Sequence, residues 1–259
     1  MEYQNRSAQA TSTVDAGLRD YMLRVYNFMA GGLGITGLVA YMLFQSTTVI
    51  DASGQLYLTN LGMTLFQGPM MWVIALAPLG IVMYMSFGIR SMSASRAQTM
   101  FWVFSFLMGM SMSTIFLQYT GASIARVFFI TASTFGAMSI YGYTTKRDLT
   151  GFGSFLFMGL IGIIIASIVN IFMQSPALYF AISILGVLIF VGLTAYDTQK
   201  IKNMYNAYDS AESSSKKAIM GALTLYLDFI NLFIMLLSCL LYTSPSPRDQ
   251  RGSRMPSSA

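Results

Sequence analysis

The chain has no histidine and one cysteine among its 259 residues, and charged residues make up only 10% of it. Without histidine, a Ser-His or Cys-His nucleophile pair, a His-ligated zinc site and a histidine pH switch are all excluded. The glycine pattern of a nucleotide-binding strand-to-helix turn is also missing from the sequence. We therefore expect a protein that is not an enzyme and needs no cofactor. Any response to pH has to come from carboxylates.

Hydrophobic residues, by contrast, make up 55% of the chain, and its mean hydropathy is +0.60. Soluble domains carry about 25% charged residues, far more than this chain does. The composition thus predicts a polytopic protein in the lipid bilayer. The isoelectric point is near 9.3, but the basic residues lie between hydrophobic runs, so they indicate membrane orientation and no nucleic-acid partner.

Hydrophobic runs of about 20 residues are long enough to cross a bilayer as helices. Seven such runs predict an all-α integral membrane protein with seven transmembrane helices. The expected spans are Met22–Phe44, Met70–Gly88, Met100–Tyr119, Ile124–Tyr143, Ser154–Met173, Ala177–Tyr196 and Ala218–Leu241. We expect three regions: a polar cytoplasmic N-terminus over 1–20, a membrane domain over 21–238 and a tail over 239–259.

Basic residues are almost confined to alternate connections between these spans. Arg90 and Arg96 follow the second span, and Lys146 and Arg147 follow the fourth. The positive-inside rule then predicts a cytoplasmic N-terminus and a periplasmic C-terminus.

The tail over 239–259 differs from the rest of the chain. Its first part, Cys239–Asp249, resembles a translated sequencing adaptor, and the residues up to Ala259 resemble further read-through. This segment is rich in Ser, Pro and Arg and has no periodicity, so we exclude it from fold reasoning. The expectation is an adaptor-derived artefact, and the alternative is a genuine disordered tail.

Asp228 lies in the middle of the last hydrophobic run. An ionised Asp at the centre of a membrane helix costs roughly 2.5–3.5 kcal/mol, so it is expected to face a partner, a water-filled cavity or a passing ion. Thr224 and Asn231 lie about one turn before and after it and share its face. The alternative is an Asp that only holds neighbouring helices together by hydrogen bonds.

Asp197 ends the sixth span close to Lys200 and Lys202. Alone it is typical of a solvated charge at a helix boundary. If Asp197 and Asp228 face one cavity, however, they cannot both ionise cheaply and would share one proton. Such a pair predicts a pH-dependent gate that needs no histidine.

Arg90, at the cytoplasmic end of the second span, is first of all a candidate membrane anchor whose long side chain reaches the interface. The alternative is a counter-ion for the aspartate pair, and Arg96 competes for that role. Asn170 in the fifth span is expected to join neighbouring helices.

Two segments, Ala195–Ile201 and Leu223–Phe233, resemble the signature of the Bax inhibitor, or transmembrane Bax-inhibitor-motif, family, and most closely its bacterial branch. The resemblance covers all seven spans. It implies that six helices surround a central seventh, and that the protein is a pH-sensitive calcium leak channel. The resemblance implies that Asp197 and Asp228 correspond to the aspartates that form the pH sensor and ion pathway in this family. It also implies that Arg90 corresponds to the family's latch, an arginine that closes the pathway.

The expected function is therefore a pH-sensitive calcium (cation) leak channel of the bacterial inner membrane, with calcium ions in transit. The alternative is a non-transporting regulator that binds a membrane protease or another membrane complex. A proton-coupled secondary transporter is a third class, but it would need an internal repeat with broken helices, which the sequence does not show.

Overall fold

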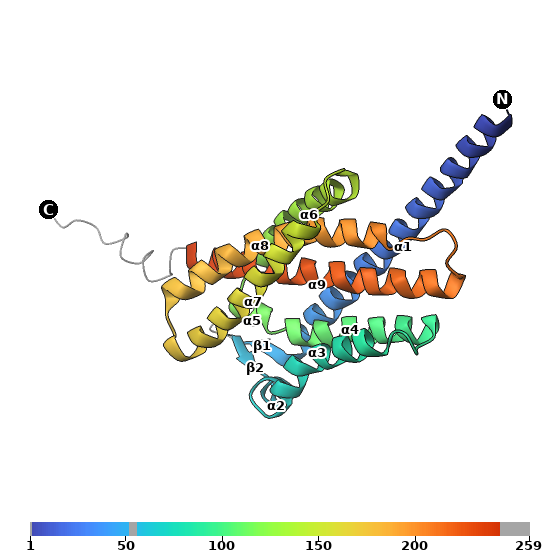
Figure 1. Cartoon of the computed structure of the whole chain (residues 1–259). Helices are drawn as coiled ribbons and strands as arrows, with labels where there is room; N and C mark the ends of the chain where they lie inside the picture. Colours follow the sequence, from blue (N-terminus) through green and yellow to red (C-terminus); the bar gives the residue numbers. More distant parts are fainter. Residues whose placement is uncertain (1, 52–55, 244–259) are drawn as a thin grey trace. The chain divides into compact units, whose positions relative to one another are not determined.

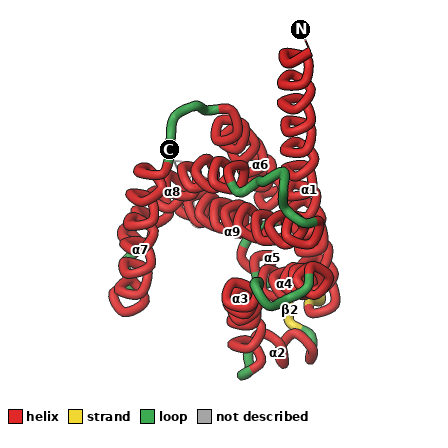
Figure 2. Tube along the Cα trace, turned by 45° about the vertical axis from the view of Figure 1, so that its right-hand side comes forward, coloured by secondary structure: helices red, strands yellow, loops and turns green. Residues whose placement is uncertain are grey.

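The computed structural model describes residues 2–51 and 56–243, with side chains over 16–51 and 56–240. Helices make up nearly all of the described chain (Figure 2). In chain order (Figure 1), the elements are α1 (Glu2–Thr47), β1 (Thr48–Ile50), β2 (Leu56–Leu58), α2 (Asn60–Phe66), α3 (Met70–Gly88), α4 (Ala94–Met112), α5 (Ile115–Gln118), α6 (Gly121–Thr144), α7 (Thr150–Met173), α8 (Pro176–Asn203) and α9 (Ala211–Thr243).

Within the described residues, seven helices are long and apolar enough to cross a membrane. The predicted all-α membrane protein with seven spans is thus confirmed. The first span differs most from expectation, because it covers Ala16–Thr47 and belongs to a helix that begins at Glu2. The segment expected as a separate polar N-terminus is therefore helical and continuous with the first span.

The described part of the chain also contains a small β-hairpin that the sequence analysis did not predict. Its strands β1 and β2 are antiparallel, with Val49 opposite Tyr57. Thr59 then caps α2 by accepting a hydrogen bond from the Gly62 amide (3.2 Å). Strands of three residues are too short for an alternating pattern to be recognised, which explains the omission.

The chain divides into two compact units. Unit 1 comprises Met1–Ala122 and Lys200–Leu227, and unit 2 comprises Ser123–Gln199 and Asp228–Ala259. In unit 1, α4 packs against both α1 and α3. Close approach of α1 and α4 depends on glycine: a Cβ on Gly109 would lie 2.8 Å from the Thr36 carbonyl oxygen.

The core of unit 2 joins three helices. Leu156 of α7, Phe190 and Leu193 of α8, and Leu232 of α9 form one buried hydrophobic cluster. These contacts lie in the parts of α8 and α9 that carry the two predicted aspartates.

Asn170 binds the turn between α7 and α8, and its expected role of joining neighbouring helices stays a prediction. Its Oδ1 accepts a hydrogen bond from the Ser175 amide (3.0 Å), and its carbonyl oxygen accepts one from the Gln174 amide (2.8 Å). Gln174 adopts a left-handed conformation (φ 49°), which ends α7. Asn170 thus closes the short turn between α7 and α8, because its side chain reaches the amides that follow the helix.

The last helix, α9, continues to Thr243, past the expected start of the tail at 239. The remainder of that expected tail, residues 244–259, lies outside the described residues. The span in α9 is 56% buried, against 11% to 39% for the other spans. A central position of this helix among six others stays a prediction.

Candidate functional site

Both predicted aspartates are buried within unit 2. Asp197 of α8 is 8% exposed, and Asp228 of α9 is 5% exposed. Both side chains interact with their surroundings. Burial of two carboxylates in one compact unit is uncommon, because charged groups are rarely buried unless they are paired or neutralised.

The contacts between α8 and α9 within unit 2 establish the register of these helices. A Cβ on Gly186 would lie 2.6 Å from the sulfur of Met235. Further along α8, Leu193 shares the core cluster with Leu232. Residue numbers thus rise along α8 as they fall along α9, which is the antiparallel pairing expected of two helices joined by a short connection.

This antiparallel pairing is compatible with the two carboxylates lying at similar levels. Asp197 lies one helical turn after Leu193, and Asp228 lies one turn before Leu232. Since residues four apart share a helix face, each aspartate shares a helix face with a leucine of the core cluster. The predicted pair is therefore compatible with the packing of unit 2.

A third helix, α6, approaches α8 beside Asp197. Gly142 lies directly against the backbone of Ala195, so that a Cβ at Gly142 would overlap the Ala195 carbonyl group. One turn away on α6, the Ser139 hydroxyl is 2.9 Å from the hydroxyl of Thr198. The two residues that flank the Tyr196–Asp197 pair are thus held by α6.

The connection between α6 and α7 is fixed to the same part of α8. The Gln199 side chain donates to the carbonyl oxygen of Arg147 (2.8 Å) and accepts from the amide of Leu149 (2.9 Å). In addition, the Tyr196 ring covers Gly153 of α7, where a Cβ would overlap the ring. The segment around Asp197 is therefore rigidly held on the α6 and α7 sides.

Aromatic side chains surround the residue after Asp228. Phe229 packs edge to face against Phe128 and Phe135 of α6, with ring centroids 5.6 Å apart in both pairs. Contacts of this geometry favour close packing of aromatic rings. Asp228 is thus followed directly by an aromatic cluster that joins α9 to α6.

The two supporting polar residues on α9 are half-buried. The Thr224 hydroxyl donates to the carbonyl oxygen of Met220 (3.1 Å) on its own helix. Asn231 lies within unit 2, as Asp228 does, whereas Thr224 lies within unit 1. Their role beside Asp228 stays a prediction.

Arg90 lies in the turn after α3, in unit 1, with an exposed side chain. Its carbonyl oxygen and that of Met92 accept hydrogen bonds from the Lys216 ammonium group (3.5 and 3.1 Å). The turn that carries Arg90 is therefore bound to the first part of α9. Because Arg90 and the aspartates belong to different units, the latch stays a prediction, as does the competing role of Arg96.

The connection between α8 and α9 is also held by a lysine. Lys217 forms an ion pair with Asp209 (2.6 Å) and donates to the carbonyl oxygen of Met204 (3.0 Å). Across the described ranges, no group of three or more acidic or cysteine side chains could hold a metal ion.

The sequence analysis missed a buried polar cluster in unit 1. Tyr226 of α9 is fully buried, and its hydroxyl is 2.6 Å from that of Thr36 on α1. Its ring packs edge to face on Phe101 and Phe104 of α4, with centroids 6.3 and 5.0 Å away. A tyrosine in an apolar run is typical of packing, and the sequence gives no signal that its partner is 190 residues away.

One ionisable group outside the spans has a shifted pKa. The Thr150 hydroxyl and amide donate to the Asp148 carboxylate (2.6 and 2.9 Å) at the start of α7. These two hydrogen bonds hold the pKa of Asp148 below its usual range.

Known proteins resemble this chain over most of its length. Residues 18–244 match the family model described as "Inhibitor of apoptosis-promoting Bax1". An uncharacterized protein of Rickettsia prowazekii is 51% identical over 225 residues, which cover 87% of this chain and 90% of that protein. Inner membrane protein YbhL of Escherichia coli K12 is 49% identical over 226 residues, which cover 86% of this chain and 91% of that protein.

The matched region includes all seven spans and both helices that carry the aspartates. An uncharacterized protein of Caulobacter vibrioides is 48% identical to this chain over 231 residues, which cover 89% of this chain and 91% of that protein. The chain therefore belongs to the Bax inhibitor family, as the resemblance of its two signature segments predicted.

Proposed function

We propose that this integral membrane protein is a pH-sensitive leak pathway for cations, calcium among them, in which Asp197 and Asp228 form the pH sensor. The observation that supports the proposal is the burial of both carboxylates, on α8 and α9, within unit 2. Two carboxylates in a poorly hydrated site repel each other strongly when both are ionised, so protons bind to them as a coupled pair. The proposed activity is passive and not enzymatic.

The proposed location is the bacterial inner membrane, with a cytoplasmic N-terminus. YbhL of Escherichia coli, a close relative, is named an inner membrane protein, and this name supports the location. Calcium is the cargo of the pathway in this proposal and is not a resident metal.

The expected sign follows from the charge of the pair. At acidic pH at least one carboxylate carries a proton, its attraction for an arginine such as Arg90 weakens, and the pathway opens. At alkaline pH the ionised pair attracts the arginine, and the pathway closes. Leak should therefore rise as pH falls, although loss of negative charge also lowers the attraction for calcium and opposes this trend.

Calcium entry into proteoliposomes tests the proposal. A calcium-sensitive dye inside the vesicles reports flux at several values between about pH 6 and about pH 8, and a coupled pair is tested by the shape of the whole profile. Wild type should leak more at the acidic end, and Asp228→Asn or Asp197→Asn should flatten this profile. The matched control is Asp20→Asn, which neutralises an exposed carboxylate and should leave the profile unchanged.

Two outcomes would contradict the proposal. A pH profile of Asp228→Asn that equals that of wild type would remove Asp228 from the sensor. Flux that never exceeds that of protein-free vesicles would exclude the leak and would favour the alternative of a regulator of another membrane protein. Thermal unfolding of each variant in detergent separates these results from misfolding, and Asp228→Asn should be at least as stable as wild type, because a buried charge is removed.

A further inference from the structure

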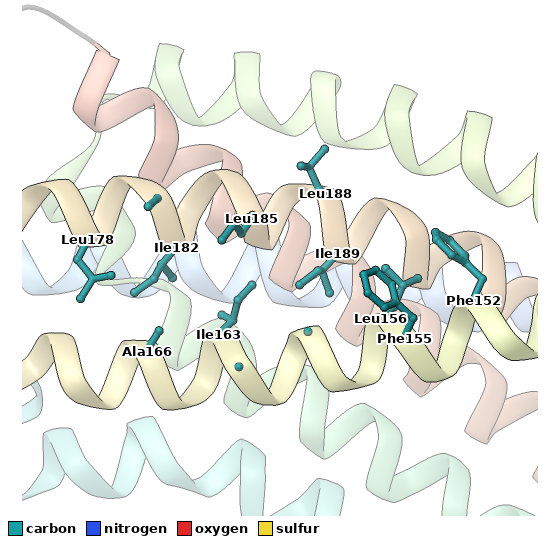
Figure 3. Close-up of a pocket in the computed structure, with 13 residues that line it drawn as sticks. Phe152, Phe155, Leu156, Ile163, Ala166, Leu178, Ile182, Leu185, Leu188 and Ile189 are labelled. Carbon is teal, nitrogen blue, oxygen red and sulfur yellow. The ribbon is translucent and has the colours of Figure 1, made fainter.

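A groove of about 550 Å³ runs between α7 and α8 within unit 2. Figure 3 shows side chains of both helices along it, from Leu178 at one end to Phe152 at the other. All of its lining residues are hydrophobic or glycine. Leu156 and Ile182 are buried in its floor, whereas Phe155 is 65% exposed at its edge.

Small residues on α7 create this space. Gly159, Gly162 and Ala166 line the groove on one helix face. A Cβ on Gly162 would meet no atom within 4 Å, so a side chain at this position would extend into the groove without displacing the helix. The groove therefore depends on small residues of α7, and a single larger side chain at Gly162 can obstruct it.

The groove is somewhat longer than the hydrocarbon region of one lipid leaflet. Its lining on α7 runs from Phe152 to Ala166, which is roughly 20 Å at about 1.5 Å per residue. One leaflet supplies about half of the roughly 30 Å hydrocarbon thickness of a bilayer. An acyl chain that enters at the membrane interface near Phe152 can thus lie in the groove over its whole length.

Cationic side chains lie at the Phe152 end of the groove. Lys146 and Arg147, in the connection just before α7, are both exposed. The two hydrogen bonds of Gln199 fix this connection against α8, the other wall of the groove. Asp148 is the one acidic residue of the connection, and its carboxylate is bound to Thr150, so the connection offers a net positive charge at the interface.

We infer that this groove binds one acyl chain of an anionic phospholipid whose phosphate group lies at Lys146 and Arg147. Lipid tails are as apolar as the lining of the groove, so the hydrophobic effect does not favour this position over the bulk bilayer. Dispersion contacts along the groove and the attraction between the phosphate and the two cations supply the preference. Charge complementarity therefore selects an anionic lipid over a zwitterionic one.

Native mass spectrometry of the full chain tests the inference. The protein is released from micelles that contain equal amounts of phosphatidylglycerol and phosphatidylcholine, and retained lipids are identified by mass. Wild type should retain phosphatidylglycerol. Gly162→Leu places a side chain across the groove and should retain little of either lipid, whereas Gly80→Leu, at an exposed glycine of α3 that also has no atom within 4 Å of its Cβ position, should behave as wild type.

A second pair of variants tests the headgroup contact. The double variant Lys146→Gln/Arg147→Gln should keep a bound lipid but lose its preference for phosphatidylglycerol by roughly 25-fold, since each of the two membrane-surface cations contributes a factor of roughly five. The control Arg19→Gln/Arg24→Gln removes two exposed arginines at the start of the first span and should keep the preference.

Three results would overturn the inference. One is equal lipid retention by Gly162→Leu and Gly80→Leu, and another is an unchanged lipid preference in the Lys146/Arg147 variant. The third is a wild-type dimer that Gly162→Leu dissociates, because the groove would then be an interface between two copies of the chain. Circular dichroism during heating confirms that each variant is folded before its lipids are counted.

Discussion

The hydroxyl of Tyr226 on α9 donates a hydrogen bond to the hydroxyl of Thr36 on α1, with 2.6 Å between the oxygens. The direction follows from the next bond, because Thr36 uses its only proton to bind the Ser105 carbonyl oxygen (2.8 Å) on α4. A carbonyl can only accept, so Tyr226 has to be the donor to Thr36. Three helices of unit 1 thus share one directed chain of hydrogen bonds.

This direction predicts unequal effects for the two partners. Tyr226→Phe should lower the free energy of unfolding by about 1 kcal/mol, because it removes one hydrogen bond and leaves Thr36 bound to Ser105. Thr36→Val should cost more, about 1–3 kcal/mol, since it leaves the Tyr226 hydroxyl buried without an acceptor. In the double variant the cost should be less than the sum of the two. Unfolding in detergent measures all three, and a larger cost for Tyr226→Phe would show that the direction is wrong.

Gly142 should tolerate no side chain. Gly142→Ala places a Cβ on the Ala195 backbone, and overpacking of this kind costs about 1–3 kcal/mol or more. The matched control on the same helix is Gly136→Ala, where a Cβ meets nothing within 4 Å. That variant should be as stable as wild type, or more stable by up to about 1 kcal/mol, because alanine favours helix. Equal melting temperatures for the two variants would contradict this reading of the α6–α8 contact.

Arg90→Ala tests the proposed latch. Without the guanidinium group, nothing at this position is attracted by the ionised aspartates, so flux at about pH 8 should rise toward its value at about pH 6, the range used for the coupled pair. If Arg90→Ala has the same flux profile as wild type, Arg90 is not the latch. If Arg96→Ala then raises the alkaline flux, Arg96 is the latch, and if neither variant does, the latch is absent.

Asp148 should not contribute to a pH response near neutrality. Its lowered pKa means that it takes up a proton only below the usual range of an aspartate, so it stays ionised between about pH 6 and pH 8. Any stability that its bonds to Thr150 contribute is present above the usual aspartate range and is lost as the pH falls through the lowered pKa. Asp148→Asn should therefore leave the flux profile unchanged, and a shifted profile would identify a sensor outside the predicted pair.

Reporter fusions test the membrane orientation. The charge distribution predicts a cytoplasmic N-terminus and a periplasmic end of the seventh span. A reporter that is active only in the cytoplasm should work when joined at Ala10 and fail when joined at Leu237. Activity at both positions would mean an even number of spans.

The sequence predicts the spans well because long apolar runs leave few structural choices in a bilayer. The run Met70–Gly88 matches α3 at both ends. The extension of α1 back to Glu2 was not predicted, since its first residues are polar and have no hydrophobic face. Helix α4 begins at Ala94, earlier than the expected start at Met100. The Ser93 side chain caps it there by accepting a hydrogen bond from the Arg96 amide (3.3 Å).

The candidate site could be predicted only in part. Asp228 is visible in the sequence because a charge in an apolar run is costly, and Asp197 becomes significant only through its place in the signature. Whether they lie near each other depends on how α8 and α9 pack, and Leu193 and Leu232 share one core cluster. Local sequence carries no information on such a pairing, nor on the bond between Tyr226 and Thr36.

The contact between Gly142 and Ala195 restricts how α6 and α8 can rearrange. A slide of one helical turn, about 5.4 Å, would bring the side chain of Met138, one turn before Gly142, onto the Ala195 backbone. A rotation of the two helices about their crossing point would have to break the Ser139–Thr198 contact and both hydrogen bonds of Gln199. Asp197 lies two residues beyond this crossing point, so we expect its backbone to keep its place against α6.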